Sequence, residues 1–201
     1  MSGVLDFARL EPGFDDAVRG AQISFRALLD AMAHPGRIVT SPASLGGAPP
    51  SPLGPAAAAV VLTLCDIDTP IWLDAASQPA AGYFAFHCGA PVVDSPAGAR
   101  FAVIADAAMM PPLECFALGS DEFPERSATL VIQVADLTNG SGIALRGPGI
   151  RGEAWLGVAG LPARFWAERT ALAALFPRGL DVVFVCSDQL AALPRSTQIT
   201  L

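Results

Sequence analysis

The sequence predicts an α/β fold. Segments with helical spacing of apolar residues are interspersed with short apolar runs typical of buried strands, a pattern that places a sheet between helices. The chain has 201 residues, of which 52% are hydrophobic and 15% are charged, so it can bury a substantial core. Apart from the stretch Ser41–Pro55, which is rich in proline and glycine, no change in composition marks a domain boundary. We therefore expect a single domain over residues 1–201.

The first predicted helix begins near Phe14, with Asp15 and Asp16 in its first turn. It is expected to end at His34-Pro35-Gly36, because the residue before a proline avoids helical backbone and glycine permits the turn. We expect its buried apolar stripe to consist of Phe14, Val18, Ala21, Phe25, Leu28, Leu29 and Met32.

Further elements follow a loop at Ser41–Pro55 that is rich in proline and glycine. The other predicted helices are Pro55–Leu64, Ala80–His87, Leu113–Leu118 and Pro162–Phe176. In the last of these, Phe165 and Leu172 should face the core while Glu168 and Arg169 face water. The predicted strands are Ile71–Leu73, Phe101–Ala105, Ala128–Val134, Ile143–Leu145, Ala154–Val158 and Val182–Cys186.

The charge balance narrows the function classes. Twelve arginines against 19 acidic residues give a net charge of −7, which argues against nucleic-acid binding. The longest apolar run, Pro55–Cys65, stops at Asp66 and is too short to cross a membrane. Asp6 and Arg9 interrupt the first ten residues, so we expect no signal peptide and a cytoplasmic protein.

The sequence lacks the residues that several kinds of catalytic chemistry require. The chain contains no lysine, which excludes a Schiff base to pyridoxal phosphate (PLP) and a P-loop. The four cysteines, Cys65, Cys88, Cys115 and Cys186, form no CxxC pair, and His34 and His87 lie far apart, so we expect neither a metal site nor a disulfide framework. We therefore predict no cofactor and no complete catalytic set.

The segment Gly147-Pro148-Gly149-Ile150-Arg151-Gly152 matches GxGxxG, but a dinucleotide site needs these glycines to lead from a strand into a helix. The residues that follow alternate like a strand, so we predict a hairpin-like turn instead. Arg146 and Arg151 flank this turn, which leaves an anion-binding role open.

Asp66-Ile67-Asp68-Thr69 resembles the nucleophile motif of haloacid-dehalogenase-type phosphatases, which follows a strand and reads Asp-x-Asp-x-Thr. Here the threonine comes one place early. A stand-alone phosphatase is therefore a minor alternative, beside the simpler interpretation that both carboxylates solvate a turn.

A set of strings in fixed order, from about Phe14 to Thr197, resembles the H-subunit family of the bacterial carbon-phosphorus lyase system. The strings are Ala21-Gln22 with Phe25-Arg26; Met32-Ala33-His34-Pro35-Gly36; Leu62-Thr63-Leu64 with Asp66, Thr69-Pro70 and Trp72-Leu73; Phe86-His87; Ser127-Ala128-Thr129-Leu130; Leu145 to Ile150; Phe176-Pro177 with Gly179 and Asp181; and Leu193-Pro194-Arg195-Ser196-Thr197.

The resemblance implies a three-layer αβα fold with a mixed sheet, like the large domain of PLP-dependent transferases but without PLP. It also implies a homodimer that joins sibling subunits G, I and J, and transiently the ATPase-like subunit L. Subunits G, H and I with L are linked to the displacement of adenine from ATP by methylphosphonate, which gives ribose 1-methylphosphonate 5-triphosphate.

Two roles within such a complex remain open. The high share of hydrophobic residues, 52% against 15% charged residues, favours a non-catalytic structural subunit that buries apolar surface against its partners. Alternatively, Arg37, Arg146, Arg151 and Arg195, which all sit beside glycine or proline turns, offer forked donors to a triphosphate. Each could instead be a surface arginine that pairs with one of the surplus carboxylates.

Overall fold

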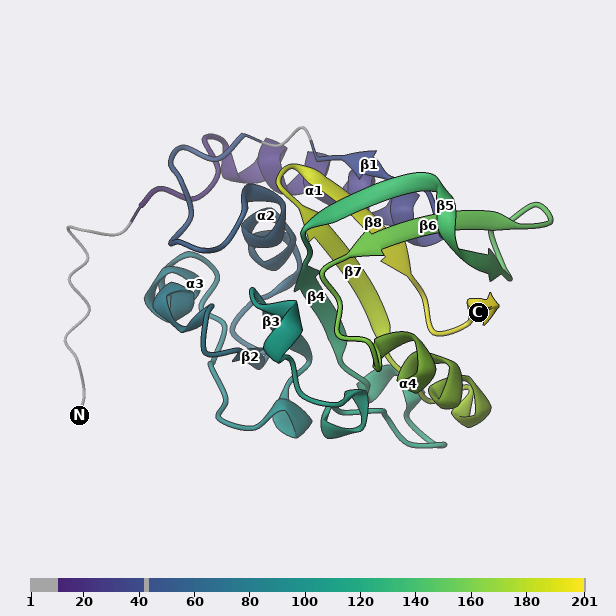
Figure 1. Ribbon diagram of the computed structural model, residues 1–201. Helices are drawn as coiled ribbons and strands as arrows, with labels where there is room; N and C mark the ends of the chain where they lie inside the picture. The colour runs from purple at the N-terminus through teal and green to yellow at the C-terminus, as the bar shows by residue number, and fades with distance from the viewer. Residues whose placement is uncertain (1–10, 42–43, 201) are drawn as a thin grey trace.

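The computed structural model describes residues 11–41 and 44–200 (Figure 1). The first ten residues, on which the expectation about a signal peptide rests, lie outside the described part, as do residues 42–43 and 201. Among the described helices, none has the length and apolar character needed to cross a membrane.

The centre of the fold is a six-stranded mixed sheet with the order β1-β8-β7-β4-β3-β2, which confirms the predicted α/β class (Figure 1). Strands β2, β3, β4 and β7 run parallel, whereas β8 and β1 join antiparallel at one side. The strands are β1 Val39–Thr40, β2 Ile71–Leu73, β3 Phe101–Ile104, β4 Thr129–Gln133, β7 Asp181–Cys186 and β8 Gln189–Leu193. Because both faces of the parallel strands are covered, their sequences are almost wholly apolar.

Three helices cover one face of this sheet, namely α1 Ala17–Ala33, α2 Pro55–Leu64 and α3 Ala81–His87 (Figure 1). Alternate strand residues such as Val131 and Val183 point into this layer, while Leu130 and Val182 point into the other. The 3-10 turn Gln78–Ala80 leads into α3, so the helix predicted at Ala80–His87 is confirmed.

The opposite face is covered by α4 Phe165–Leu172 together with a three-stranded antiparallel sheet of order β6-β5-β9 (Figure 1). Its strands are β5 Asp136–Arg146, β6 Ala154–Ala159 and β9 Gln198–Thr200. The third layer is therefore part helix and part sheet, which corrects the expectation of a purely helical one. Short 3-10 turns complete the chain at Pro96–Gly98, Ala107–Met109, Leu113–Cys115, Pro124–Arg126 and Ala173–Leu175.

The glycine-rich segment at residues 147–152 joins β5 to β6 antiparallel, so the predicted hairpin is confirmed. Strands β1, β8 and β9 were not predicted. β7 and β8 form a hairpin through Ser187 and Asp188, in which Ser187 adopts a φ of 55°. Such turns are usually recognised by glycine or asparagine, and neither residue is present here.

The prediction for the buried face of α1 is partly wrong. Leu28 is buried, but Val18, Phe25 and Leu29 are exposed. The face that packs on α2 and β8 consists instead of small residues with Leu28, namely Gly20, Ser24, Ala27, Leu28 and Ala31. Small side chains let the helix approach its neighbours closely, which leaves the larger apolar side chains on the outer face.

Two further expectations about helices are corrected. The helix predicted over Leu113–Leu118 is only the turn Leu113–Cys115, because Phe116 is extended and places its ring in the core against Trp72, with the ring centroids 5.8 Å apart. In α4, Phe165 and Leu172 are buried as predicted, but Arg169 is also buried. Its Nη2 donates to the Pro194 carbonyl oxygen at 2.8 Å.

We predict that Gly149→Ala strongly destabilises the fold. Gly149 has a φ of 80°, and an added Cβ would lie 2.0 Å from the carbonyl oxygen of Ala33 at the end of α1. The substitution should lower the free energy of unfolding in urea by about 3 kcal/mol or more. Gly152→Ala is the matched control, because Gly152 has a φ of 82° with nothing within 4 Å, and should cost about 1 kcal/mol. Equal losses would contradict this account.

Candidate functional site

A cleft of about 380 Å³ lies between the C-terminal end of α1 and the β5–β6 connection. It is lined by His34, Pro35, Gly36, Arg37, Gly149, Ile150, Arg151, Glu153 and Ala154. The cleft therefore unites the His-Pro-Gly string and the glycine-rich hairpin, which are far apart in the sequence.

Glycines allow the two walls to meet. The N–H of His34 donates to the Asp30 carbonyl oxygen and closes α1, and Gly36 turns the chain with a φ of 91°. A Cβ on Gly36 would lie 2.9 Å from the Cβ of Ala154, just as Gly149 leaves no room for a side chain against Ala33. The close approach of these backbones fixes the cleft.

Asp30 organises one wall of the cleft. Its carboxylate accepts two hydrogen bonds from Arg37 Nη1, at 3.0 and 3.2 Å. The Nδ1 of His34 lies 3.0 Å from both the carbonyl oxygen and Oδ1 of Asp30. Arg37 is thereby held at the rim, and among the described residues its Nε and Nη2 make no hydrogen bond within the chain.

The hairpin supplies the other wall. Arg151 is exposed and forms no ion pair with any described residue. Arg146 does not line the cleft, but its Nε lies 3.2 Å from Oε1 of Glu153, which does. One carboxylate thus lines the cleft beside two guanidinium groups, those of Arg37 and Arg151. Guanidinium groups bind the oxygens of phosphate-type anions through paired donors, so the cleft can accept such an anion.

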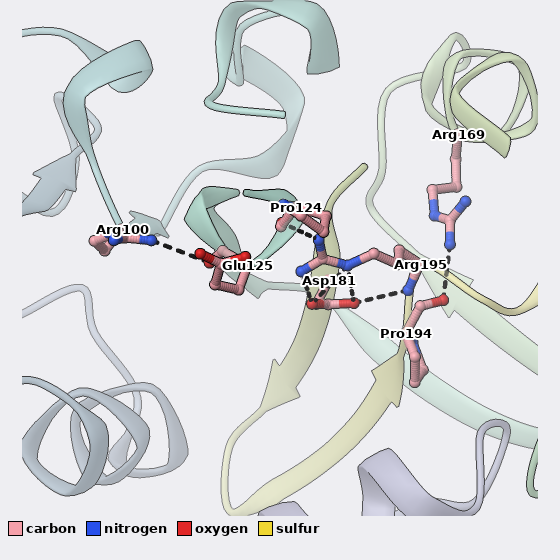
Figure 2. A network of polar contacts seen from close by, with 7 residues as sticks. All are labelled: Arg100, Pro124, Glu125, Arg169, Asp181, Pro194 and Arg195. Atoms are coloured by element: carbon pink, nitrogen blue, oxygen red, sulfur yellow. Dashed lines mark hydrogen bonds and ion pairs between the residues drawn. The ribbon is translucent and has the colours of Figure 1, made fainter. Parts of the chain in front are cut away.

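Arg195 lies elsewhere, just after the end of β8, and contacts Asp181 at the start of β7 in a network that links separate parts of the chain (Figure 2). Its backbone N–H and its side chain both donate to the Asp181 carboxylate, with Nε 3.2 and 3.1 Å from the two oxygens. Its Nη1 donates to the Pro124 carbonyl oxygen at 2.6 Å. The donors of Arg195 are used within the chain, so we assign it a structural role.

Arg169 belongs to the same region (Figure 2). Burial lowers its pKa, and the nearby positive charge of Arg195 adds to this effect, while Asp181 opposes it. Only 2% of Arg169 is exposed, and its Nε has no partner among the described atoms. Asp181 therefore serves as the shared counter-charge of two guanidinium groups at the amino end of β7.

The phosphatase alternative loses its structural basis. Asp66 follows the end of helix α2 and not a strand, so the premise of a nucleophile strand is wrong. Its Oδ1 accepts hydrogen bonds from the Thr69 hydroxyl at 2.6 Å and from the Asp68 N–H at 3.0 Å, and these bonds lower its pKa. This is the geometry of a solvated turn.

The histidine and cysteine side chains are also accounted for. His87 Nε2 lies 2.9 Å from the Glu11 carbonyl oxygen, while Cys88 Sγ donates to the Phe84 carbonyl oxygen at 3.1 Å. All four cysteines are free. Burial raises the pKa of the Cys65 and Cys88 thiols. Within the described ranges, no three histidine, cysteine or acidic side chains are placed to hold a metal ion.

Of the four arginines singled out from the sequence, the structure thus brings Arg37 and Arg151 to one cleft, places Arg146 beside it and puts Arg195 in a separate network. Sequence reasoning missed Asp30 and Glu153 and treated His34 only as part of a helix end. The one available signal was the pair of glycine strings, whose contact the sequence does not reveal.

Comparison with known proteins assigns the family. Residues 12–200 match the family described as bacterial phosphonate metabolism protein (PhnH). The chain is 43% identical over 188 residues to the alpha-D-ribose 1-methylphosphonate 5-triphosphate synthase subunit PhnH of Rhizobium meliloti (strain 1021), covering 92% of this chain and 93% of that protein. It is also 42% identical over 84 residues to a protein of Stutzerimonas stutzeri provisionally named C-P lyase subunit protein HtxG, covering 42% of this chain and 43% of that one.

The chain is therefore an α/β protein with a mixed sheet and an arginine-lined cleft, and its family is one of phosphonate metabolism. It belongs to the PhnH family, as the ordered strings in its sequence indicated.

We predict that Arg195→Gln lowers the free energy of unfolding by about 2–4 kcal/mol, because it leaves the carboxylate of Asp181 without its bidentate partner. Arg151→Gln removes an exposed arginine without an ion pair among the described residues, and should change stability by no more than about 0.5 kcal/mol. Urea denaturation of both variants measures the difference. A loss for Arg151→Gln as large as for Arg195→Gln would refute the distinction between the two arginines.

We also predict that the cysteines react unequally. Thiolate is the reactive form, and the raised pKa of buried Cys65 leaves little of it at pH 8, whereas Cys115 is exposed. A thiol reagent followed by peptide mass spectrometry should therefore label Cys115 first and Cys65 only after unfolding. Labelling of both at one rate in the folded protein would show that Cys65 is not enclosed.

Proposed function

We propose that this chain is a subunit of the complex that converts methylphosphonate and ATP to ribose 1-methylphosphonate 5-triphosphate. The observation that carries this proposal is 43% identity over almost the full length of both chains to a protein named as a subunit of that synthase. In this reaction a phosphonate oxygen forms a bond to C1′ of the ribose, the C1′–N9 bond breaks, and adenine leaves with a proton.

Within the complex, we assign the chain a non-catalytic, structural role and no activity on its own. The exposure of large apolar side chains such as Val18 and Leu29 supports this role, because subunits of stable assemblies carry apolar surfaces for their partners. Its proposed partners are sibling subunits G, I and J, with L bound transiently, and a second copy of this chain in a homodimer. The location that fits is the cytoplasm.

The finer fold assignment also belongs to this proposal. We expect residues 1–201 to act as a single domain that resembles the large domain of PLP-dependent transferases without using PLP. The mixed sheet supports this likeness, and the lack of lysine in the sequence agrees with a protein that forms no Schiff base.

A second role is supported by one specific observation, the cleft that brings Arg37 and Arg151 together. In this role the chain contributes directly to the transferase site by holding the triphosphate of ATP or of the product. Arg146 would assist from beside Glu153, whereas Arg195 is occupied by Asp181. A triphosphate carries enough negative charge to engage both guanidinium groups across the cleft.

The subunit role predicts that product forms only when this chain is present. Methylphosphonate and ATP are followed by phosphorus NMR with subunits G, I and L, in the presence and absence of the chain, and the chain alone serves as the control. Complex size is measured by native mass spectrometry. Equal product without the chain, in a complex that still binds it, would leave it only an assembly role. Turnover by the isolated chain would contradict the proposal.

The direct role predicts a charge-specific loss. The double variant Arg37→Gln/Arg151→Gln should assemble normally but raise the KM for ATP about tenfold or more, because hydrogen bonds to charged groups contribute about 1.5–3 kcal/mol each. Arg126→Gln is the control, since Arg126 is an exposed arginine outside the cleft. An unchanged KM with intact assembly would restrict the chain to the structural role.

A further inference from the structure

The outer face of α1 presents an apolar stripe. Val18 is 82% exposed, Phe25 49% and Leu29 56%, and their spacing of seven and four residues places them on one side of the helix. Gln22, which is also exposed, lies between Val18 and Phe25 on the same side. The inner face of the helix packs on α2 and β8, so the packing of the described residues does not require this stripe.

A row of positive charge runs beside the stripe. Arg19 and Arg26 follow Val18 and Phe25 by one residue each, and both are exposed. Neither guanidinium forms an ion pair with a carboxylate of the described residues, although the chain carries 19 acidic residues. Arginine beside apolar side chains is the composition that protein interfaces favour.

We propose that this face of α1, defined by Val18, Arg19, Gln22, Phe25, Arg26 and Leu29, binds a sibling subunit that presents an apolar groove bordered by carboxylates. The inference rests on the proposed function, since it names a surface through which the chain joins the complex. The apolar stripe fills the groove, and the two arginines pair with the carboxylates along one edge.

A second copy of this chain does not fit the same face. In a two-fold dimer, if residue i of one copy contacts residue j of the other, then residue j of the first copy contacts residue i of the second. An axis that crosses the helix at Gln22 turns one copy end to end and places Arg19 of one copy opposite Arg26 of the other, and the repulsion of like charges opposes this pairing. An axis that runs along the helix lays the arginine row of each copy against the other edge of its partner's stripe, where Ala21 and Met32 offer no carboxylate, so the arginines would stay unpaired. The proposed homodimer must therefore use a different face.

The stripe also leads toward the cleft. One turn after Leu29 comes the exposed residue Ala33, whose carbonyl oxygen is the atom packed against Gly149. His34 and Arg37 follow directly. A subunit seated on α1 would thus border the cleft, so that residues of two chains could share one site.

The first test uses Phe25→Ser/Leu29→Ser, with Ile67→Ser/Met109→Ser as the matched control. Ile67 and Met109 are 75% and 80% exposed and lie outside α1, so the control removes exposed apolar side chains of similar size. The wild-type chain and the two variants are each co-expressed with the sibling subunits. Circular dichroism confirms the fold, and native mass spectrometry then measures assembly. We expect about tenfold or greater loss of affinity for the α1 variant and little loss for the control.

A charge-reversal variant tests the arginine row. Arg19→Glu/Arg26→Glu should weaken assembly at low ionic strength, and added salt should reduce its difference from the wild type. A photo-crosslinking residue at position 22 then identifies the occupant of the face. Crosslinks to a sibling subunit support the proposal, whereas crosslinks to a second copy, or none in the assembled complex, overturn it.

The outcomes separate this inference from the proposed function. If the wild-type chain assembles and Phe25→Ser/Leu29→Ser assembles equally well, the α1 surface is wrong while the subunit role stands. If the wild-type chain joins no sibling subunit, the proposed function itself fails.

Discussion

The close packing of α1 against α2 and β8 is the constraint on which both proposed surfaces depend. Its inner face carries mainly small residues, among them Gly20, Ala27 and Ala31, so the helix lies near its neighbours. This orientation turns Val18, Phe25 and Leu29 outward. It also brings the end of α1 against the β5–β6 connection, where Gly149 leaves no space for a side chain. One packing arrangement therefore produces an apolar outer stripe and an arginine-lined cleft at its end.

Much of the fold could be predicted from local patterns. Helical spacing of apolar residues identified α1 and α4, and short apolar runs identified the buried parallel strands. The failures have physical causes. β8 is rich in alanine and leucine, and it follows a turn without glycine, so its sequence lacks strand signals. The spacing of hydrophobic residues predicted the wrong buried face for α1, because small side chains can decide which face of a helix packs. Arg169 appeared solvent-facing because its buried partner, the Pro194 carbonyl oxygen, belongs to a distant part of the chain.

The candidate site shows the same limit more sharply. The sequence could identify Arg37 and Arg151 as arginines beside turns, but their shared cleft depends on a contact between distant glycine strings. Nothing local distinguished them from Arg195, whose guanidinium is held by Asp181 (Figure 2). An arginine that pairs with a carboxylate inside the chain can be told from one that is free to bind a ligand only when its contacts in the folded structure are known. The proposed reaction comes from the name of the 43% identical relative, whereas the proposed binding surfaces come from the structure.

We propose that the chain acts as a subunit whose α1 face and adjoining cleft lie at a boundary with a different subunit. The most direct measurement is an electron cryo-microscopy structure of the chain assembled with its sibling subunits, ATP and methylphosphonate. We expect another subunit to cover Val18, Phe25 and Leu29 and to reach the rim formed by Arg37 and Arg151. An assembled complex in which the outer face of α1 remains open to solvent would contradict it.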